Sequence, residues 1–209
     1  MPVSPPGGGG SGAPRVGVFG GSFNPVHLGH LIQADEARAL LSLDSVLFVP
    51  ARVPPHKEAA ALLDGEERAA LLEIALAGSR GFELSRLDLD REGPSYTVET
   101  IRRVRAALPP ASETFLLLGA DSLLDLPGWR SPEEIVRSTR LAVFPRIGYD
   151  VGAVSSDLRR SVEVLDTPLI DISSAEIRSR IRDGRPYRFL LPEGVFRRIE
   201  ERRLYRAGP

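Results

Sequence analysis

A glycine-rich segment near the N-terminus, Gly20-Gly21-Ser22-Phe23-Asn24-Pro25-Val26-His27-Leu28-Gly29-His30, carries residue types suited to phosphate chemistry. Its first two glycines have no Cβ, so a bulky ligand can approach their backbone closely. His27 and His30 are three residues apart, so in a first helical turn their imidazoles point the same way. Two imidazoles beside the N–H groups of a helix N-terminus can donate hydrogen bonds to phosphate oxygens. The segment therefore predicts an anion site.

A second candidate anion site lies near the C-terminus, at Ile172-Ser173-Ser174-Ala175-Glu176-Ile177-Arg178. Ser173 and Glu176 have the spacing of a capping box, which by itself explains both residues as a helix start. A hydroxyl-rich helix N-terminus also attracts anions, and Arg178, one turn further on, can add a bidentate contact. The two interpretations are compatible.

The residues around these segments predict the elements that position them. Arg15–Phe19 is a short apolar run typical of a buried strand, and apolar residues at helical spacing predict a helix from near Gly29. Further strands are expected at 45–50, 82–90, 114–119, 141–145 and 162–165, and further helices at 64–76, 98–108, from 131, 151–160, 173–183 and 192–205. In an open parallel sheet, ligands bind at the carboxyl ends of the strands.

These motifs resemble the signature of the nucleotidyltransferase superfamily that carries a His-x-Gly-His motif. Other segments narrow the resemblance to bacterial nicotinate-nucleotide adenylyltransferases, and they are Pro-Pro-His-Lys at 54–57, Ser-Tyr-Thr at 95–97, Gly-Ala-Asp-Ser at 119–122 and Pro-Gly-Trp at 127–129. The resemblance extends from Arg15 to Tyr205. It implies a Rossmann-like, doubly wound parallel sheet with a small C-terminal helical part.

The implied activity is adenylyl transfer from ATP to nicotinate mononucleotide, which yields nicotinate adenine dinucleotide and pyrophosphate in NAD biosynthesis. His27 and His30 would be the catalytic residues, with His30 carrying more of the transition-state charge. The residues implied to bind ATP are Gly20, Gly21, Ser22, Phe23, Asp121, Ile172, Ser173, Ser174 and Arg178. Mg²⁺ is expected as the cofactor, held by phosphates and water rather than by a protein site.

The residues implied to bind the mononucleotide are Lys57, Ser95, Thr97, Trp129 and Arg130. Lys57 is the single lysine among 27 basic residues, although its Pro-rich segment also fits an ordinary solvated loop. Ser95 or Thr97 also fits a helix N-cap, and Trp129 also fits a core position. Related enzymes commonly have tyrosine where this chain has Arg130, which makes Arg130 a candidate partner for the substrate carboxylate.

Asp121 follows a strongly apolar strand, and two roles fit it. A carboxylate at the carboxyl end of a strand can accept hydrogen bonds from ribose hydroxyls, whereas the same residue can simply cap the following helix. The resemblance favours the adenosine side of the site.

Composition supports one domain over residues 15–209, preceded by a Pro- and Gly-rich tail at 1–14 that we expect to be disordered. The formal net charge of −1 gives no reason to expect nucleic-acid or membrane partners, and the lack of cysteine excludes thiolate chemistry. The chain has no signal pattern or long apolar run, which favours the cytoplasm. The sequence leaves open a homo-oligomer.

Three other functions remain open. One is adenylyl transfer to nicotinamide mononucleotide, and another is transfer to a different phosphate acceptor such as phosphopantetheine. The third is a non-catalytic nucleotide sensor that keeps the same fold.

Overall fold

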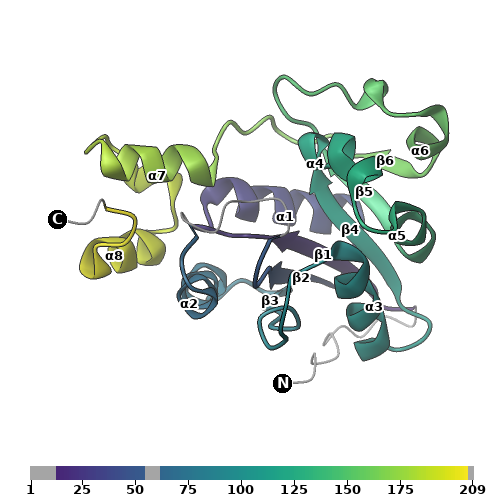
Figure 1. The fold of residues 1–209 in the computed structure, drawn as a ribbon, viewed down its shortest axis with the longest axis horizontal. Helices are drawn as coiled ribbons and strands as arrows, with labels where there is room; N and C mark the ends of the chain where they lie inside the picture. The colour runs from purple at the N-terminus through teal and green to yellow at the C-terminus, as the bar shows by residue number, and fades with distance from the viewer. Residues whose placement is uncertain (1–12, 55–61, 207–209) are drawn as a thin grey trace.

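A computed structural model of the protein describes residues 13–54 and 62–206. Six parallel strands form one sheet in the order β3-β2-β1-β4-β5-β6, with helices on both faces (Figure 1). The strands are β1 Arg15–Gly21, β2 Ser45–Pro50, β3 Phe82–Leu84, β4 Glu113–Gly119, β5 Arg140–Phe144 and β6 Val162–Val164. The predicted Rossmann-like, doubly wound sheet is confirmed.

The strands are apolar on both faces because each face is covered by helices. The phenylalanines of β1, β2, β4 and β5 lie in one core, whereas Val18, Leu47, Leu116 and Val143 lie in the other. Helices α1 Leu28–Leu40, α2 Gly65–Leu76, α7 Ser174–Arg182 and α8 Glu193–Arg202 pack in the first core. Helices α3 Thr97–Ala107, α4 Ala120–Asp125 and α5 Pro132–Ser138 pack in the second.

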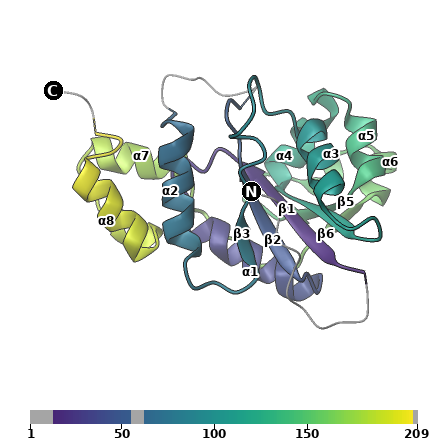
Figure 2. The same cartoon turned by 90° about the horizontal axis from the view of Figure 1, so that it is seen from below.

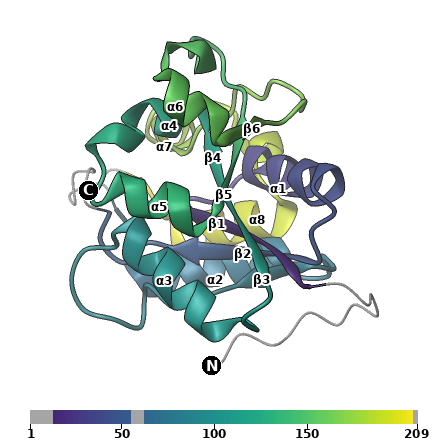
Figure 3. The same cartoon turned by 90° about the vertical axis from the view of Figure 1, so that its right-hand side faces the viewer.

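Two groups of helices lie at opposite ends of the molecule. Helices α7 and α8 form the expected C-terminal helical part and lie beside α2 (Figure 2). Helices α3 and α5 lie side by side on the other face of the sheet (Figure 3). The remaining short elements are α6 Ser156–Arg160 and three 3₁₀ turns, η2 Leu126–Gly128, η3 Val151–Ala153 and η4 Arg188–Leu190. No helix in the described ranges is long and apolar enough to cross a membrane.

The sheet changes direction of winding between β1 and β4. Strand β1 pairs with β2 on one side and with β4 on the other, so the connections from β1 and from β4 leave toward opposite edges. A crevice outside the carboxyl ends of the strands at such a point is where ligands bind in this class of fold. The glycine-rich segment follows β1 here, and Asp121 follows β4.

One strand prediction was wrong, and the capping roles considered as alternatives for Ser95, Thr97 and Asp121 are excluded. Strand β3 ends at Leu84 rather than at Asp90. Leu89 lies in a turn, but its side chain is buried, so the sequence shows the apolar alternation of a strand where there is none. The N-cap of α3 is Tyr96, and Ser95 Oγ instead accepts a hydrogen bond from Arg52 N at 2.9 Å. Asp121 lies inside the first turn of α4, whose N-cap is Gly119.

Candidate functional site

Residues 20–27, here called the site loop, comprise the end of β1 and the segment that joins it to α1 at the carboxyl edge of the sheet. Among the described residues, a Cβ added at Gly20 would meet nothing within 4 Å, which leaves room for a ligand at that backbone, whereas a Cβ at Gly21 would lie 3.2 Å from the Phe23 ring. Gly29 has a different role, since a Cβ there would lie 3.1 Å from His27 Nδ1. The glycine between the two histidines therefore makes room for the His27 ring.

The two imidazoles stack on each other, with ring centroids 3.6 Å apart and planes inclined by 27°. His27 N donates a hydrogen bond to His30 Nδ1 at 3.2 Å. Because Nδ1 of His30 accepts a hydrogen, the proton of a neutral His30 ring is placed on Nε2. The backbone thus fixes His30 in the tautomer that presents an Nε2–H donor, while Phe19 and Phe23 hold its ring edge-on.

His27 is less accessible than the sequence suggests. Its side chain is only 5% exposed, and within the described chain its Nδ1 has no hydrogen-bond partner. Burial, assisted by the positive charge of Arg146, lowers the pKa of His27 to about 3. The ring is therefore neutral at physiological pH, and its burial leaves His30 as the more accessible donor to a phosphate.

The start of α7 contacts the site loop directly, although the two are about 150 residues apart in sequence. Ser174 Oγ donates to Pro25 O at 2.8 Å, and Arg178 Nη1 donates to Asn24 O at 2.7 Å. Burial lowers the pKa of Arg178, and its Nε has no partner within the described residues. The structure thus brings together the two anion-site motifs that the sequence singled out.

The start of α7 has the serine half of the predicted capping box, whereas the Glu176 carboxylate accepts hydrogen bonds from Arg180 and Arg185 instead. Ser173 Oγ accepts a hydrogen bond from Glu176 N at 3.1 Å. Because the Ser174 hydroxyl is used on the site loop, an anion at this helix start would bind chiefly through the backbone N–H groups of the first turn. Ile172, next to the cap, packs on the core around α7.

The side chain of Phe23 lies inside the core, 1% exposed, and its backbone has φ of 45°. Any contact of Phe23 with ATP is therefore limited to its backbone. Ser22 and Gly21 on its N-terminal side are half-buried. The predicted ATP contacts in this part of the loop thus depend on backbone geometry more than on side chains.

The carboxylate of Asp121 forms an ion pair with Arg146, an arginine that the sequence analysis did not assign to the site. Arg146 Nη1 donates to Asp121 Oδ2 at 2.9 Å, and both side chains are partly exposed. The available signal was positional: Arg146 follows β5 as Asp121 follows β4, and these strands are neighbours with Gly119 paired to Phe144. The positive charge of Arg146 also helps to lower the pKa of His27.

The predicted mononucleotide residues Ser95, Thr97, Trp129 and Arg130 form what we call the α3–η2 face, and Lys57 lies outside the described residues. Ser95 is buried and holds Arg52 N, and Thr97 is the first residue of α3. Trp129 is half-buried and packs on the second core. The guanidinium of Arg130 lies 4.7 Å from the Tyr96 ring centroid and 3.4 Å from Glu99 Oε1.

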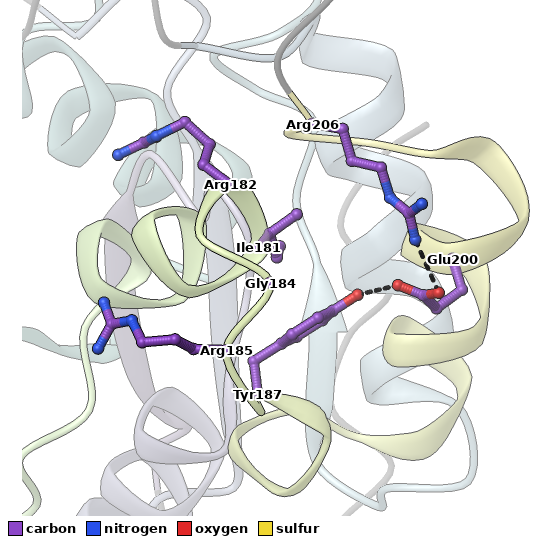
Figure 4. A pocket seen from close by; sticks show the side chains of 7 residues that line it. All are labelled: Ile181, Arg182, Gly184, Arg185, Tyr187, Glu200 and Arg206. Atoms are coloured by element: carbon purple, nitrogen blue, oxygen red, sulfur yellow. Dashed lines mark hydrogen bonds and ion pairs between the residues drawn. The ribbon is translucent and has the colours of Figure 1, made fainter.

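A separate cavity of about 400 Å³ lies between the end of α7 and the end of α8, and none of the predicted site residues that the structure describes lines it (Figure 4). Inside it Glu200 accepts hydrogen bonds from Tyr187 Oη and, at 2.8 Å, from Arg206 Nη2. These bonds fix the C-terminal turn that carries Tyr205. Tyr205 Oη donates in turn to Asn24 Oδ1 at 3.0 Å, so the C-terminal part supports the site loop.

The titratable side chains of residues 13–54 and 62–206 form no group of three or more that could hold a metal ion. Asp121, the carboxylate predicted to belong to the site, is bound to Arg146. A divalent cation that arrives with a nucleotide would be held through the phosphates of that nucleotide.

Comparison with known proteins assigns this chain to a family. The cytidylyltransferase-like family model matches residues 18–180. A probable nicotinate-nucleotide adenylyltransferase of Thermus thermophilus is 43% identical over 192 residues, which are 92% of this chain and 100% of the relative. One from Geobacillus thermodenitrificans is 39% identical over 193 residues, 92% of this chain and 87% of the relative.

Solved structures support the fold. The nicotinic acid mononucleotide adenylyltransferase of Plasmodium falciparum, complexed with NaAD, has a TM-score of 0.75 at 17% identity. The match covers 92% of this chain and 97% of that one. A putative nicotinate-nucleotide adenylyltransferase from Vibrio parahaemolyticus has a TM-score of 0.68 at 18% identity, over 93% and 97% of the two chains.

Proposed function

The chain belongs to the cytidylyltransferase-like family and, within it, to the nicotinate-nucleotide adenylyltransferases, and from this premise we propose that it transfers the adenylyl group of ATP to nicotinate mononucleotide. The products are nicotinate adenine dinucleotide and pyrophosphate, a step in NAD biosynthesis. The reaction consumes ATP, and we expect it to take place in the cytoplasm.

The observation that carries the proposal is the contact between the site loop and the start of α7. The hydrogen bonds from Ser174 and Arg178 to the loop bring the imidazoles and a capped helix N-terminus to one edge of the sheet. A triphosphate spans several donors at once, and here donors from two helices converge beside a backbone that is open at Gly20.

The chemical step needs no general base. A phosphate oxygen of the mononucleotide attacks the α-phosphorus of ATP, a new P–O bond forms, and the bond to the β-phosphate oxygen breaks with release of pyrophosphate. The nucleophile is already anionic near neutral pH, so catalysis consists of positioning and charge stabilisation.

We assign His30 to the reacting α-phosphate through its Nε2–H. His27 supports His30 by stacking and through its backbone N–H, and it contributes a neutral ring. The β- and γ-phosphates are held by the N–H groups of Ser173 and Ser174 together with Arg178. The carboxylate of Asp121 accepts hydrogen bonds from the ribose hydroxyls after its ion pair with Arg146 has broken. ATP enters with Mg²⁺ bound to its phosphates and to water.

The α3–η2 face binds the mononucleotide in this proposal. Trp129 stands at the edge of the second core, where its ring can stack on a planar pyridine. Arg130 lies on the Tyr96 ring and can exchange Glu99 for the substrate carboxylate. Ser95 contributes indirectly, because its hydroxyl holds Arg52 N.

Pyrophosphate release from purified protein tests the activity. ATP with nicotinate mononucleotide should release pyrophosphate, and ATP with phosphopantetheine should not. Binding of ATP without pyrophosphate release from either acceptor would favour the nucleotide sensor. Equal kcat/KM for the acid and amide mononucleotides would contradict the proposed preference for nicotinate.

A further inference from the structure

Arg68 is a charged residue in a position that the pattern of α2 assigns to the core. It shares the helical spacing of Leu71, Leu72 and Ala75, and its side chain is 0% exposed. A guanidinium remains charged in a protein, and burial of a charge is unfavourable unless hydrogen bonds compensate it. A fully buried arginine therefore needs a reason that hydrophobic packing does not supply.

The donors of Arg68 go to backbone carbonyls in three separate segments. Nε donates to Leu63 O at 2.9 Å, Nη1 to Ser22 O at 2.8 Å and Nη2 to Arg52 O at 3.2 Å. Among the residues described, no carboxylate lies within 4.0 Å of its nitrogen atoms. All the hydrogen bonds of Arg68 thus go to peptide carbonyls beside the site loop, and the Asp64 carboxylate acts on its charge without a direct ion pair.

One of these bonds sets the direction of a peptide group in the site loop. In a trans peptide the C=O and the following N–H point in opposite directions. Because Arg68 holds Ser22 O toward α2, the N–H of Phe23 points to the other side of the loop. Phe23 itself has φ of 45°, a conformation that a bulky residue keeps only where its surroundings impose it.

A second bond links the loop to the other half of the proposed site. Arg52 O accepts from Arg68, and Arg52 N donates to Ser95 Oγ on the α3–η2 face. One guanidinium thus connects the segment that meets ATP to the segment that meets the mononucleotide. The rate of a displacement between two bound substrates depends steeply on their spacing.

We propose that Arg68 is a positioning residue for adenylyl transfer, which holds the site loop and the α3–η2 face at a fixed spacing and orients the loop amides. This inference rests on the proposed function and adds to it a residue that touches neither substrate. The buried positive charge of Arg68 also makes the electrostatic potential at the loop more positive, which favours the negative charge of phosphates bound there.

The test compares Arg68→Met and Arg68→Lys with a matched control, Arg198→Met. Arg198 Nε donates to Glu67 Oε1 at 3.0 Å and joins α8 to the same helix without touching the site loop. For each variant, the thermal midpoint, kcat and both KM values are measured, with the wild-type enzyme in the same assay.

We expect Arg68→Met to lower kcat by roughly 30-fold or more while both KM values change by less than about threefold. Arg68→Lys should recover part of this loss, since lysine keeps the charge but cannot reach three carbonyls in a fork. Arg198→Met should lower the thermal midpoint and leave kcat within about twofold of the wild type.

The proposal is overturned if Arg68→Met keeps kcat within about twofold of the wild type, or if its whole effect is a lower thermal midpoint like that of Arg198→Met. If Arg68→Met does not fold, Arg68→Lys decides by the same criterion. A wild-type enzyme that releases no pyrophosphate contradicts the proposed function, and with it the positioning role that rests on that function.

Discussion

The site loop and the α3–η2 face both follow the carboxyl ends of strands, but they pack on different cores and are held in different ways. Buried and half-buried donors from α2, α7 and the C-terminal turn fix the loop, through Arg68, Arg178 and Tyr205. On the α3–η2 face, Arg130 has a 58% exposed side chain and is held by a ring contact and an ion pair of 3.4 Å. Exposed ion pairs contribute little to stability, whereas multiply bonded buried groups resist rearrangement.

The difference in how the two regions are held indicates that they have different roles. In the proposed function the loop holds its donors in place where charge is stabilised during the reaction, because preorganised donors need no rearrangement in the transition state. The α3–η2 face can adjust its exposed side chains where a ligand ring and carboxylate must be recognised. Substitutions in the loop should therefore change kcat, and substitutions on the face should change KM.

The largest effect is expected from His30→Ala. Loss of the Nε2–H donor at the α-phosphate should lower kcat by roughly 100-fold or more with little change in the thermal midpoint. Steady-state kinetics with ATP and nicotinate mononucleotide measures this effect. An unchanged kcat would remove His30 from the reaction and with it the contrast between the two regions.

His27 should make its contribution visible in the pH dependence of stability. Its pKa is lowered from 6.5 to about 3 by burial, so the unfolded chain binds a proton that the folded protein does not in this range. The stabilisation is present above the unfolded pKa and is lost as pH falls toward the folded pKa. Below about pH 6, we expect the titration of His27 to lower the free energy of unfolding by about 1.4 kcal/mol for each pH unit that the pH falls.

Urea unfolding of the wild type and His27→Gln at a series of pH values checks this expectation. The diagnostic is the slope of unfolding free energy against pH, which should be flatter in the variant by about one proton. Equal slopes would mean that His27 is protonated in the folded protein, and that its ring is more accessible than its 5% exposure indicates.

Arg178→Met should have a smaller and more selective effect. We expect KM for ATP to rise by roughly tenfold, because one charged contact to the terminal phosphates is lost. The matched control is Arg180→Met on the same helix, whose Nε donates to Glu176 instead. A rise confined to KM for the mononucleotide would contradict the assignment of α7 to ATP.

The smallest effect is expected at Arg130, on the exposed face. Arg130→Ala should raise KM for nicotinate mononucleotide by roughly threefold and should leave kcat unchanged. The ratio of kcat/KM for the acid and amide mononucleotides should fall by the same factor. If the variant instead loses kcat as His30→Ala does, the α3–η2 face is as rigid as the loop.

The sequence predicted the sheet well because buried parallel strands are continuous apolar runs, such as Phe115–Leu118. It failed over 82–90, where Asp88 is buried and bonded to Thr100 rather than exposed on a strand. Alternation of apolar residues does not distinguish a strand from a turn that returns leucines to the core.

The motifs located the candidate site, but not what holds it. Nothing in the sequence around Asn24 indicates that Tyr205 donates to its side chain, because that contact spans the whole chain. Arg68 did leave a local signal, a charge at a core position of the α2 stripe. Its carbonyl partners are backbone atoms in three segments, and their identity depends on tertiary structure alone.

The central claim is that the site loop and the start of α7 form one triphosphate site. A crystal structure with Mg²⁺ and a non-hydrolysable ATP analogue tests it most directly. We predict the α-phosphate within hydrogen-bond distance of His30 Nε2 and the terminal phosphates at the N–H groups of Ser173 and Ser174. An analogue whose phosphates lie away from α7, or in the cavity beside Glu200, would contradict the account.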